Sequence, residues 1–160
     1  MIKGISTEEV SSKLESFYAY EELTAEFAKA AINRLAGQAE IFLKPPLMQK
    51  MKDAERNAAR LASRIARLGG AIPADPTNFV DVSPIESYTL PDPNDMGPFL
   101  GYALEQERIA IRFYSDFLDQ IKERDVITYF EAFEILKNHV DVEDEIETFI
   151  VQTGKVGAPK

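Results

Sequence analysis

The sequence predicts an all-α protein: a four-helix bundle in which one long crossover joins two helical hairpins. In four long segments, apolar residues recur at three- and four-residue spacing, the period of a helix with one buried face. Glycines and prolines separate these segments. One connection, residues 70–97, holds five prolines and is far longer than ordinary loops in compact domains. These three observations together favour the bundle.

The first helix is expected over residues 7–37. Ser6 and Glu9 form a capping-box pattern directly before an apolar run. The run continues at helical spacing until Gly37, where we expect the helix to end.

The second helix is expected over residues 46–69. The stretch "LKPPL" at 43–47 should break the chain before it, and Pro46 is compatible with a first helical turn. Gly69 and Gly70 are expected to end this helix. The crossover loop 70–97 then has a reason for its length, because crossing the whole bundle lets the second and third helices run parallel.

The third and fourth helices are expected over residues 98–123 and 125–153, with a tight corner between them. There is no internal repeat and no low-complexity segment, so residues 1–160 are interpreted as a single domain.

Composition excludes several classes of function. The net charge is −9, and this disfavours binding to nucleic-acid phosphate, so DNA binding is not supported. No apolar run is long enough to span a membrane. The chain has no cysteine, which excludes thiolate metal sites and Fe–S clusters, and we expect a cytoplasmic protein. It has one histidine, so no site can use two imidazoles from one subunit.

Four stretches resemble the ferritin-like superfamily, and within it the bacterioferritin-related, archaeal Dps-like branch. Each corresponds to part of one helix of that family. They are "YEELTAEF" (20–27), "LASRIARLGGAIPADP" (61–76), "ALEQERIAIRFY" (103–114) and "FEAFEILKNHVDVEDEIETFI" (130–150). The resemblance implies a ferritin-like bundle that assembles into a homo-oligomer, a dodecameric shell in this branch.

The resemblance also implies a two-iron centre in the middle of the bundle. In such proteins the first and third helices each give one glutamate, and the second and fourth each give a Glu-x-x-His pair. Carboxylates and imidazoles suit iron, and residues three apart on a helix share a face. Carried over to this chain, the two single glutamates fall on Glu22 and Glu107 and are present.

The two Glu-x-x-His pairs are mostly missing. In the second helix they fall on Ala54 and Asn57, and neither is an ordinary ligand. In the fourth helix they fall on His139 and Val142, so an imidazole stands where the carboxylate is expected. Half of the six ligand positions are therefore able to bind a metal.

Two interpretations of this centre remain open. In one, Glu22, Glu107 and His139 form a reduced site for one ion of iron or another divalent metal, with Asn57 and Tyr18 as supporting residues. In the other, no metal binds, and the buried carboxylates share a proton or bond to tyrosine or arginine.

The predicted function follows from these alternatives. The first is a ferritin/Dps-like shell protein that binds a metal at the reduced site, with weak ferroxidase activity or none. The second is a metal-free structural or assembly member of the family. A third, an oxidoreductase with a mononuclear site, has no substrate that the sequence names.

Two charged patterns are interpreted as surface features. Four arginines of the second helix recur at helical spacing, and we expect them to pair with carboxylates: Arg56, Arg60, Arg64 and Arg67. An acidic cluster at 141–147 is expected to be a solvated helix face.

Overall fold

The computed structural model describes residues 5–85 and 89–153, and along these ranges all regular structure is helical. Four long helices make up the bundle: α1 (Thr7–Arg34), α2 (Gly37–Arg67), α4 (Met96–Ile121) and α5 (Val126–Thr153). The predicted all-α class and the four-helix architecture are therefore confirmed. No helix in the two described ranges has the length and apolarity needed to cross a membrane.

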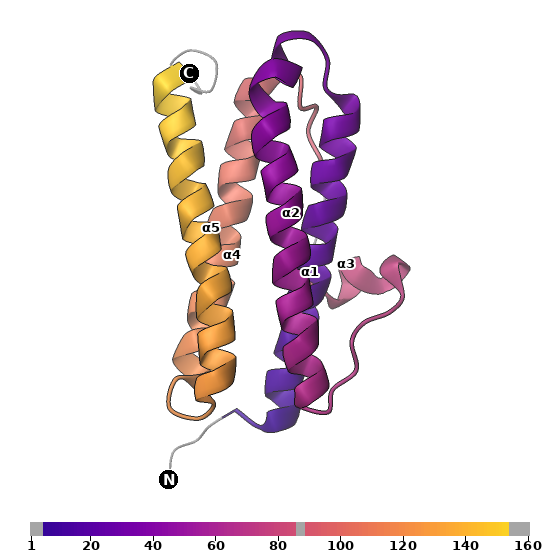
Figure 1. The fold of residues 1–160 in the computed structure, drawn as a ribbon, viewed down its shortest axis with the longest axis vertical. Helices are drawn as coiled ribbons and strands as arrows, with labels where there is room; N and C mark the ends of the chain where they lie inside the picture. Colours follow the sequence, from indigo (N-terminus) through magenta and orange to yellow (C-terminus); the bar gives the residue numbers. More distant parts are fainter. Residues whose placement is uncertain (1–4, 86–88, 154–160) are drawn as a thin grey trace.

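The helices form two hairpins, α1 with α2 and α4 with α5 (Figure 1). The crossover returns along the outside of α1 to the end of the bundle where α2 begins. As a result α2 and α4 run parallel, as the length of the connection predicts (Figure 1).

The crossover is fixed to the bundle at several points. It contains the short helices η1 (Pro76–Asn78) and α3 (Phe79–Val82), and Phe79 packs against Ala19 and Leu23 of α1. Near its end, Asn94 accepts a hydrogen bond from the backbone N–H of Ala36 and donates one to the carbonyl of Arg34. The long connection is thus an ordered part of the fold over its described residues.

The start of α1 follows the predicted cap. Ser6 is the N-cap, and its hydroxyl accepts a hydrogen bond from the backbone N–H of Glu9. The helix ends at Arg34, three residues earlier than expected, and Gly37 adopts a positive φ of 58° at the start of α2.

The predicted start of the second helix at residue 46 is wrong, because α2 begins at Gly37 and runs through Pro45 and Pro46. A proline inside a helix removes one backbone hydrogen bond and costs about 3 kcal/mol or more. Both prolines lie on the exposed side, where water can hydrate the freed carbonyls. On the opposite side Leu43 packs with Phe99 and Leu100, and this burial keeps the segment helical.

Apart from the small cluster that Phe79 forms with α1, the core described inside the bundle has two parts. Near the α4–α5 corner lies an aromatic cluster, the aromatic half, whose buried members include Phe17, Tyr114, Phe117, Ile121 and Ile135. The opposite end, the cavity half, is built on a smaller group of buried residues: Ala31, Ala39, Leu43, Phe99 and Leu100. Between the two parts lies a group of buried charged side chains.

Candidate functional site

A chain of ionisable side chains, all buried except the partly buried Lys50, crosses the middle of the bundle, with contributions from all four long helices. We call it the polar centre: Glu21 of α1, Lys50 of α2, Glu107 and Tyr114 of α4, and His139 of α5. Glu21, Tyr114 and His139 have no exposed surface, and Glu107 is 2% exposed.

His139 lies between two carboxylates. Its Nδ1 is 2.6 Å from Oε2 of Glu107, and its Nε2 is 2.7 Å from Oε1 of Glu21. Ionised carboxylates only accept hydrogen bonds, so both ring nitrogens act as donors here. The ring of Tyr114 stacks on the imidazole with centroids 5.5 Å apart, and its hydroxyl donates to Glu21 at 3.0 Å.

Lys50 completes the centre. Its ammonium group forms an ion pair with Oε1 of Glu107, so this glutamate contacts one cation through each oxygen. Two carboxylates, one imidazolium and one ammonium balance to zero charge. A buried ionic group of this kind is stable only when its charges are paired.

The electrostatics agree with these charge states. Burial alone would lower the pKa of His139, but Glu21 and Glu107 outweigh it and raise the pKa to about 9. Burial alone would raise the pKa of Glu107, but Lys50 and His139 lower it to about 2. The carboxylates likewise raise the pKa of Lys50 against the effect of burial. At neutral pH the histidine is therefore protonated and Glu107 is ionised.

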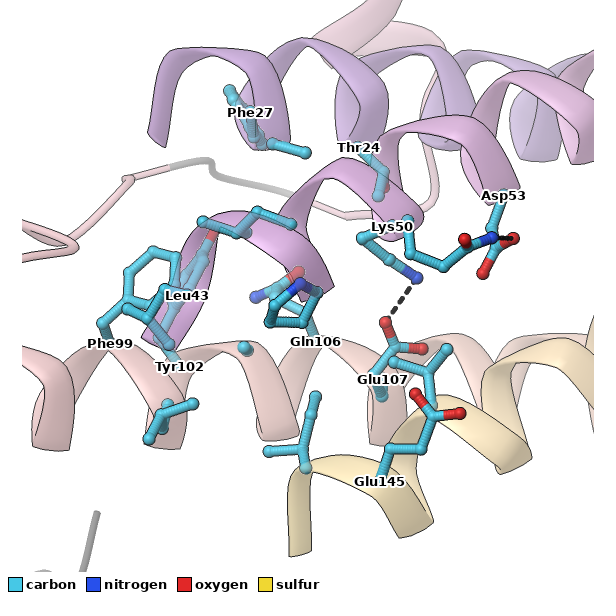
Figure 2. A pocket seen from close by; sticks show the side chains of 18 of the residues that line it. Thr24, Phe27, Leu43, Lys50, Asp53, Phe99, Tyr102, Gln106, Glu107 and Glu145 are labelled. Carbon is cyan, nitrogen blue, oxygen red and sulfur yellow. Dashed lines mark hydrogen bonds and ion pairs between the residues drawn. The ribbon is translucent and has the colours of Figure 1, made fainter. Parts of the chain in front are cut away.

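A cavity of about 400 Å³ adjoins the polar centre on the side of the cavity half. Figure 2 shows Lys50 and Glu107 at one end of it and the apolar side chains of Leu43 and Phe99 at the other. The lining includes the exposed residue Glu145, so the cavity opens to solvent there.

The comparisons with known proteins bear on the fold. No family model matches the chain. The DNA protection during starvation protein of Pyrococcus furiosus is 32% identical over 95 residues, which are 59% of this chain. The match covers 50% of that relative, so this chain spans about half the length of the curated relative it matches.

A solved structure gives the decisive comparison. The bacterioferritin-related protein from Bacteroides fragilis, a dodecameric thioferritin, superposes with a TM-score of 0.86 at 16% identity. The superposition covers 94% of this chain and 89% of that one. The chain has a ferritin-like fold.

The ferritin-like bundle places the predicted site residues as follows. Glu107 and His139 meet in the polar centre, in direct contact. The prediction that Glu22 faces the centre is off by one residue, because Glu21 occupies that position. Glu22 is only partly buried, and its pKa is raised by burial and by the nearby carboxylates of Glu55 and Glu26.

Of the two supporting residues, Tyr18 lies away from the expected place, whereas Asn57 lies in the interior of the bundle. Tyr18 packs edge-on against Phe79 of the crossover, while Tyr114 is the tyrosine that bonds to the centre. Asn57 is buried and donates to Asn138 of α5, which in turn donates to Asp53. This amide pair links α2 to α5 beside the centre.

The residue that the sequence interpretation missed is Lys50. On α2 the residue that contacts Glu107 is Lys50, and Asp53, one turn further along, lines the adjoining cavity. A signal was present, because Lys50 continues the inward stripe of α2 at three- and four-residue steps. That stripe includes Leu43, Leu47, Ala54, Ala58 and Leu61. Glu21 could have been found in the same way, four residues after the buried Phe17.

These residues do not fit a metal centre as they stand. In residues 5–85 and 89–153, no group of three or more His, Asp or Glu side chains is arranged to hold an ion. A protonated imidazole has no lone pair to offer, and Lys50 takes the Oε1 lone pair of Glu107 that would face a cation.

The arginine stripe of α2 is paired, as expected, over three of its four members. Arg56 contacts Asp53, Arg60 contacts Glu131 of α5 at 2.7 Å, and Arg64 contacts Asp125 at 3.1 Å. The Arg60 pair joins α2 to α5, and the Arg64 pair joins α2 to the residue just before α5.

Proposed function

We propose that this protein is a metal-independent subunit of a ferritin-like shell, in which a salt-bridge network takes the place of the iron centre. The observation that carries the proposal is the Lys50 ammonium on Glu107, next to a histidine with a carboxylate on each ring nitrogen. Lysine and histidine supply the positive charge that iron would bring.

The electrostatic argument is general. Two carboxylates buried close together repel each other, so one of them must take a proton or both must gain a cation. In this chain the two cations are side chains, fixed by covalent bonds to α2 and α5. The fold then needs no metal to neutralise its centre, and Ala54, Asn57 and Val142 stand where the resemblance implies ligands for iron.

Shell formation is supported by an exposed apolar face on the first turns of α5. The side chains of Val126, Ile127, Phe130 and Phe133 are 43–71% exposed. An apolar patch of this kind on a globular protein marks a contact surface. The bacterioferritin-related protein with the same fold is described as dodecameric, and we propose a homo-oligomeric shell for this chain.

DNA binding does not enter the proposal, although the relative from Pyrococcus furiosus is named for DNA protection. The net charge of −9 opposes it. Arg56, Arg60 and Arg64 are already paired with carboxylates.

A single divalent ion is the second candidate, and one observation favours it. Oε2 of Glu21 is buried and has no hydrogen-bond partner among the described residues. An ion could use this oxygen together with Glu107 and His139, but only if Lys50 swings away and His139 loses its proton.

Metal analysis decides between these candidates. Protein equilibrated with Fe(II), Mn(II) or Zn(II), then desalted, should retain no stoichiometric ion and should not speed the oxidation of Fe(II) in air. Lys50→Glu should gain metal affinity, since a third carboxylate replaces the internal cation. Lys52→Glu is the matched control, because it makes the same charge change at an exposed position of α2.

Retention of one ion per chain by the unaltered protein, lost in Glu21→Gln, would overturn the metal-independent centre and support the second candidate.

Light scattering tests the shell separately. The unaltered chain should have a mass many times that of one subunit, and Phe130→Asp should reduce it by placing a charge in the apolar face. Val151→Asp is the control, because Val151 is 79% exposed at the other end of the same helix. A monomeric unaltered protein would exclude the shell and leave the metal question intact.

A further inference from the structure

The cavity beside the polar centre has the features of a ligand site. Ligand pockets are mostly apolar with a few convergent polar groups and have volumes of about 300–1,000 Å³. This cavity, at about 400 Å³, lies at the lower end of that range. Two alanines in its wall, Ala28 and Ala103, leave the space open where larger side chains would fill it.

The size limits the ligand. A cavity of about 150 Å³ holds benzene, so by the same packing this cavity has room for roughly 16 non-hydrogen atoms. Much of its wall is aliphatic or aromatic: Phe27, Leu43, Leu47, Phe99, Ile146 and Phe149. Water in such a space has few polar partners, and its displacement by an apolar chain is favourable.

The polar end of the cavity defines the head group. Nζ of Lys50 is buried and, apart from its ion pair with Glu107, has no hydrogen-bond acceptor in the described part of the chain. An ammonium carries three N–H groups, so unused donors remain at this end of the cavity. Figure 2 shows Lys50 and Glu107 facing each other there.

The charges around the cavity favour an uncharged head group over an anionic one. The polar centre is already neutral, and the acids Asp53 and Glu145 also line the cavity. Asp53 is neutralised by Arg56. A carboxylate placed on Lys50 would therefore add one unbalanced negative charge beside the buried polar centre, whereas a carbonyl or hydroxyl oxygen would accept from Lys50 without that cost.

We infer that this cavity binds an uncharged, mostly apolar small molecule with one terminal hydrogen-bond acceptor, such as a medium-chain ketone or alcohol. The acceptor oxygen bonds to the Lys50 ammonium, and the chain extends along Leu43, Phe99 and Phe149. No bond is made or broken in the ligand. The inference does not require the shell, but it rests on the charge balance of the metal-independent centre.

Calorimetric titration of the full chain with 2-decanone tests the inference, with decanoate as the anionic comparison. The ketone should bind saturably at one site per chain. Decanoate should bind at least about tenfold more weakly, which corresponds to about 1.4 kcal/mol. Tighter binding of decanoate would overturn the uncharged head group, and non-saturable uptake of the ketone would overturn the site itself.

Two variants locate the site. Ala103→Phe should abolish binding by filling the cavity, and Ala59→Phe, on the exposed side of α2, should leave binding unchanged. Equal binding by both would show that the ketone binds elsewhere.

Lys50→Met should weaken binding of the ketone by about tenfold, and unchanged affinity would remove Lys50 from the site. If Lys50→Met does not fold, the two alanine variants and the ketone–decanoate comparison remain decisive. A metal found in the unaltered protein, together with absent ketone binding, would mean that the metal-independent centre has failed too. Ketone binding absent from a metal-free protein would reject the ligand site alone.

Discussion

The two halves of the bundle are packed differently. In the aromatic half, Phe17 contacts three rings, those of Phe113, Tyr114 and Phe117, with centroids 4.7–5.2 Å apart. In the cavity half, aromatic, aliphatic and small side chains, with Pro46 of α2 among them, surround a cavity of about 400 Å³. Protein interiors are ordinarily close-packed, so we expect the aromatic half to contribute more to stability than the half that contains the cavity.

The largest expected effect is on the free energy of unfolding, and it tests the difference in packing between the two halves. Phe17→Ala in the aromatic half should lower the free energy of unfolding by about 3–5 kcal/mol, because it deletes a buried ring from close packing. Phe99→Ala should cost roughly half as much, since one side of that ring already faces the cavity and has fewer contacts to lose. Chemical denaturation measures both. Equal losses would mean that the cavity half is packed as tightly as the aromatic half.

The second prediction concerns the polar centre, which lies between the two halves. Lys50→Met leaves the Glu107 carboxylate with one partner fewer and should cost about 3–5 kcal/mol. The double variant Lys50→Met/Glu107→Met removes one charge of each sign and leaves Glu21 and His139 as a balanced pair. It should recover most of that loss, because replacing a whole buried ion pair with apolar side chains is often nearly neutral. A double variant as unstable as the sum of its two single variants would show that the charges are not coupled.

Much of the fold was predictable, because the periodicity of apolar residues and the long proline-rich connection depend on sequence positions alone. The start of α2 at Gly37 was not predictable from the sequence. The cost of Pro45 and Pro46 is local, whereas the burial of Leu43 against Phe99 depends on a contact between distant parts of the chain. Tertiary packing therefore determines where α2 begins, although the two prolines locally disfavour a helix there.

The sequence predicts that Glu107 and His139 lie together at the centre, but it predicts neither the ion pair with Lys50 nor the register of the first helix. Glu107 and His139 were placed correctly, while Glu21 replaces Glu22, a shift of one residue that turns a helical side chain by about 100°. Lys50 was missed because a lysine side chain on a helix is ordinarily solvated. Only the three-dimensional pairing with Glu107 reveals it as the internal cation.

The third prediction concerns the effect of pH on the polar centre of the unaltered protein. The pKa of His139 is raised from 6.5 to about 9 in the folded protein. A raised pKa gives stability that is fully present below the unfolded value and is lost as pH rises through the folded value. Stability should therefore fall by roughly 2 kcal/mol between pH 7 and about pH 9.

Denaturation curves of the unaltered chain and of His139→Gln measure this effect, and the variant should lose the dependence over that interval. Glu107, with its pKa lowered to about 2, gives the opposite limit: its stabilisation is present above the unfolded value and is lost only as pH falls toward 2. An unaltered chain whose stability rises from pH 7 to pH 9 would contradict a protonated His139.

The smallest expected effect concerns two ion pairs at the surface. In the aromatic half, Arg60 of α2 reaches Glu131 of α5, and both side chains are about one-third exposed or less, at 33% and 28%. Arg112 pairs with Glu105 on its own helix, with side chains 63% and 55% exposed. Exposed ion pairs contribute about 0–1 kcal/mol. Arg60→Ala should therefore cost up to about 1 kcal/mol and Arg112→Ala close to nothing, because only the first pair joins two helices and is partly shielded from water. Paired denaturation curves measure the difference, and a larger loss in Arg112→Ala would mean that the contact between α2 and α5 adds nothing to the stability of the aromatic half.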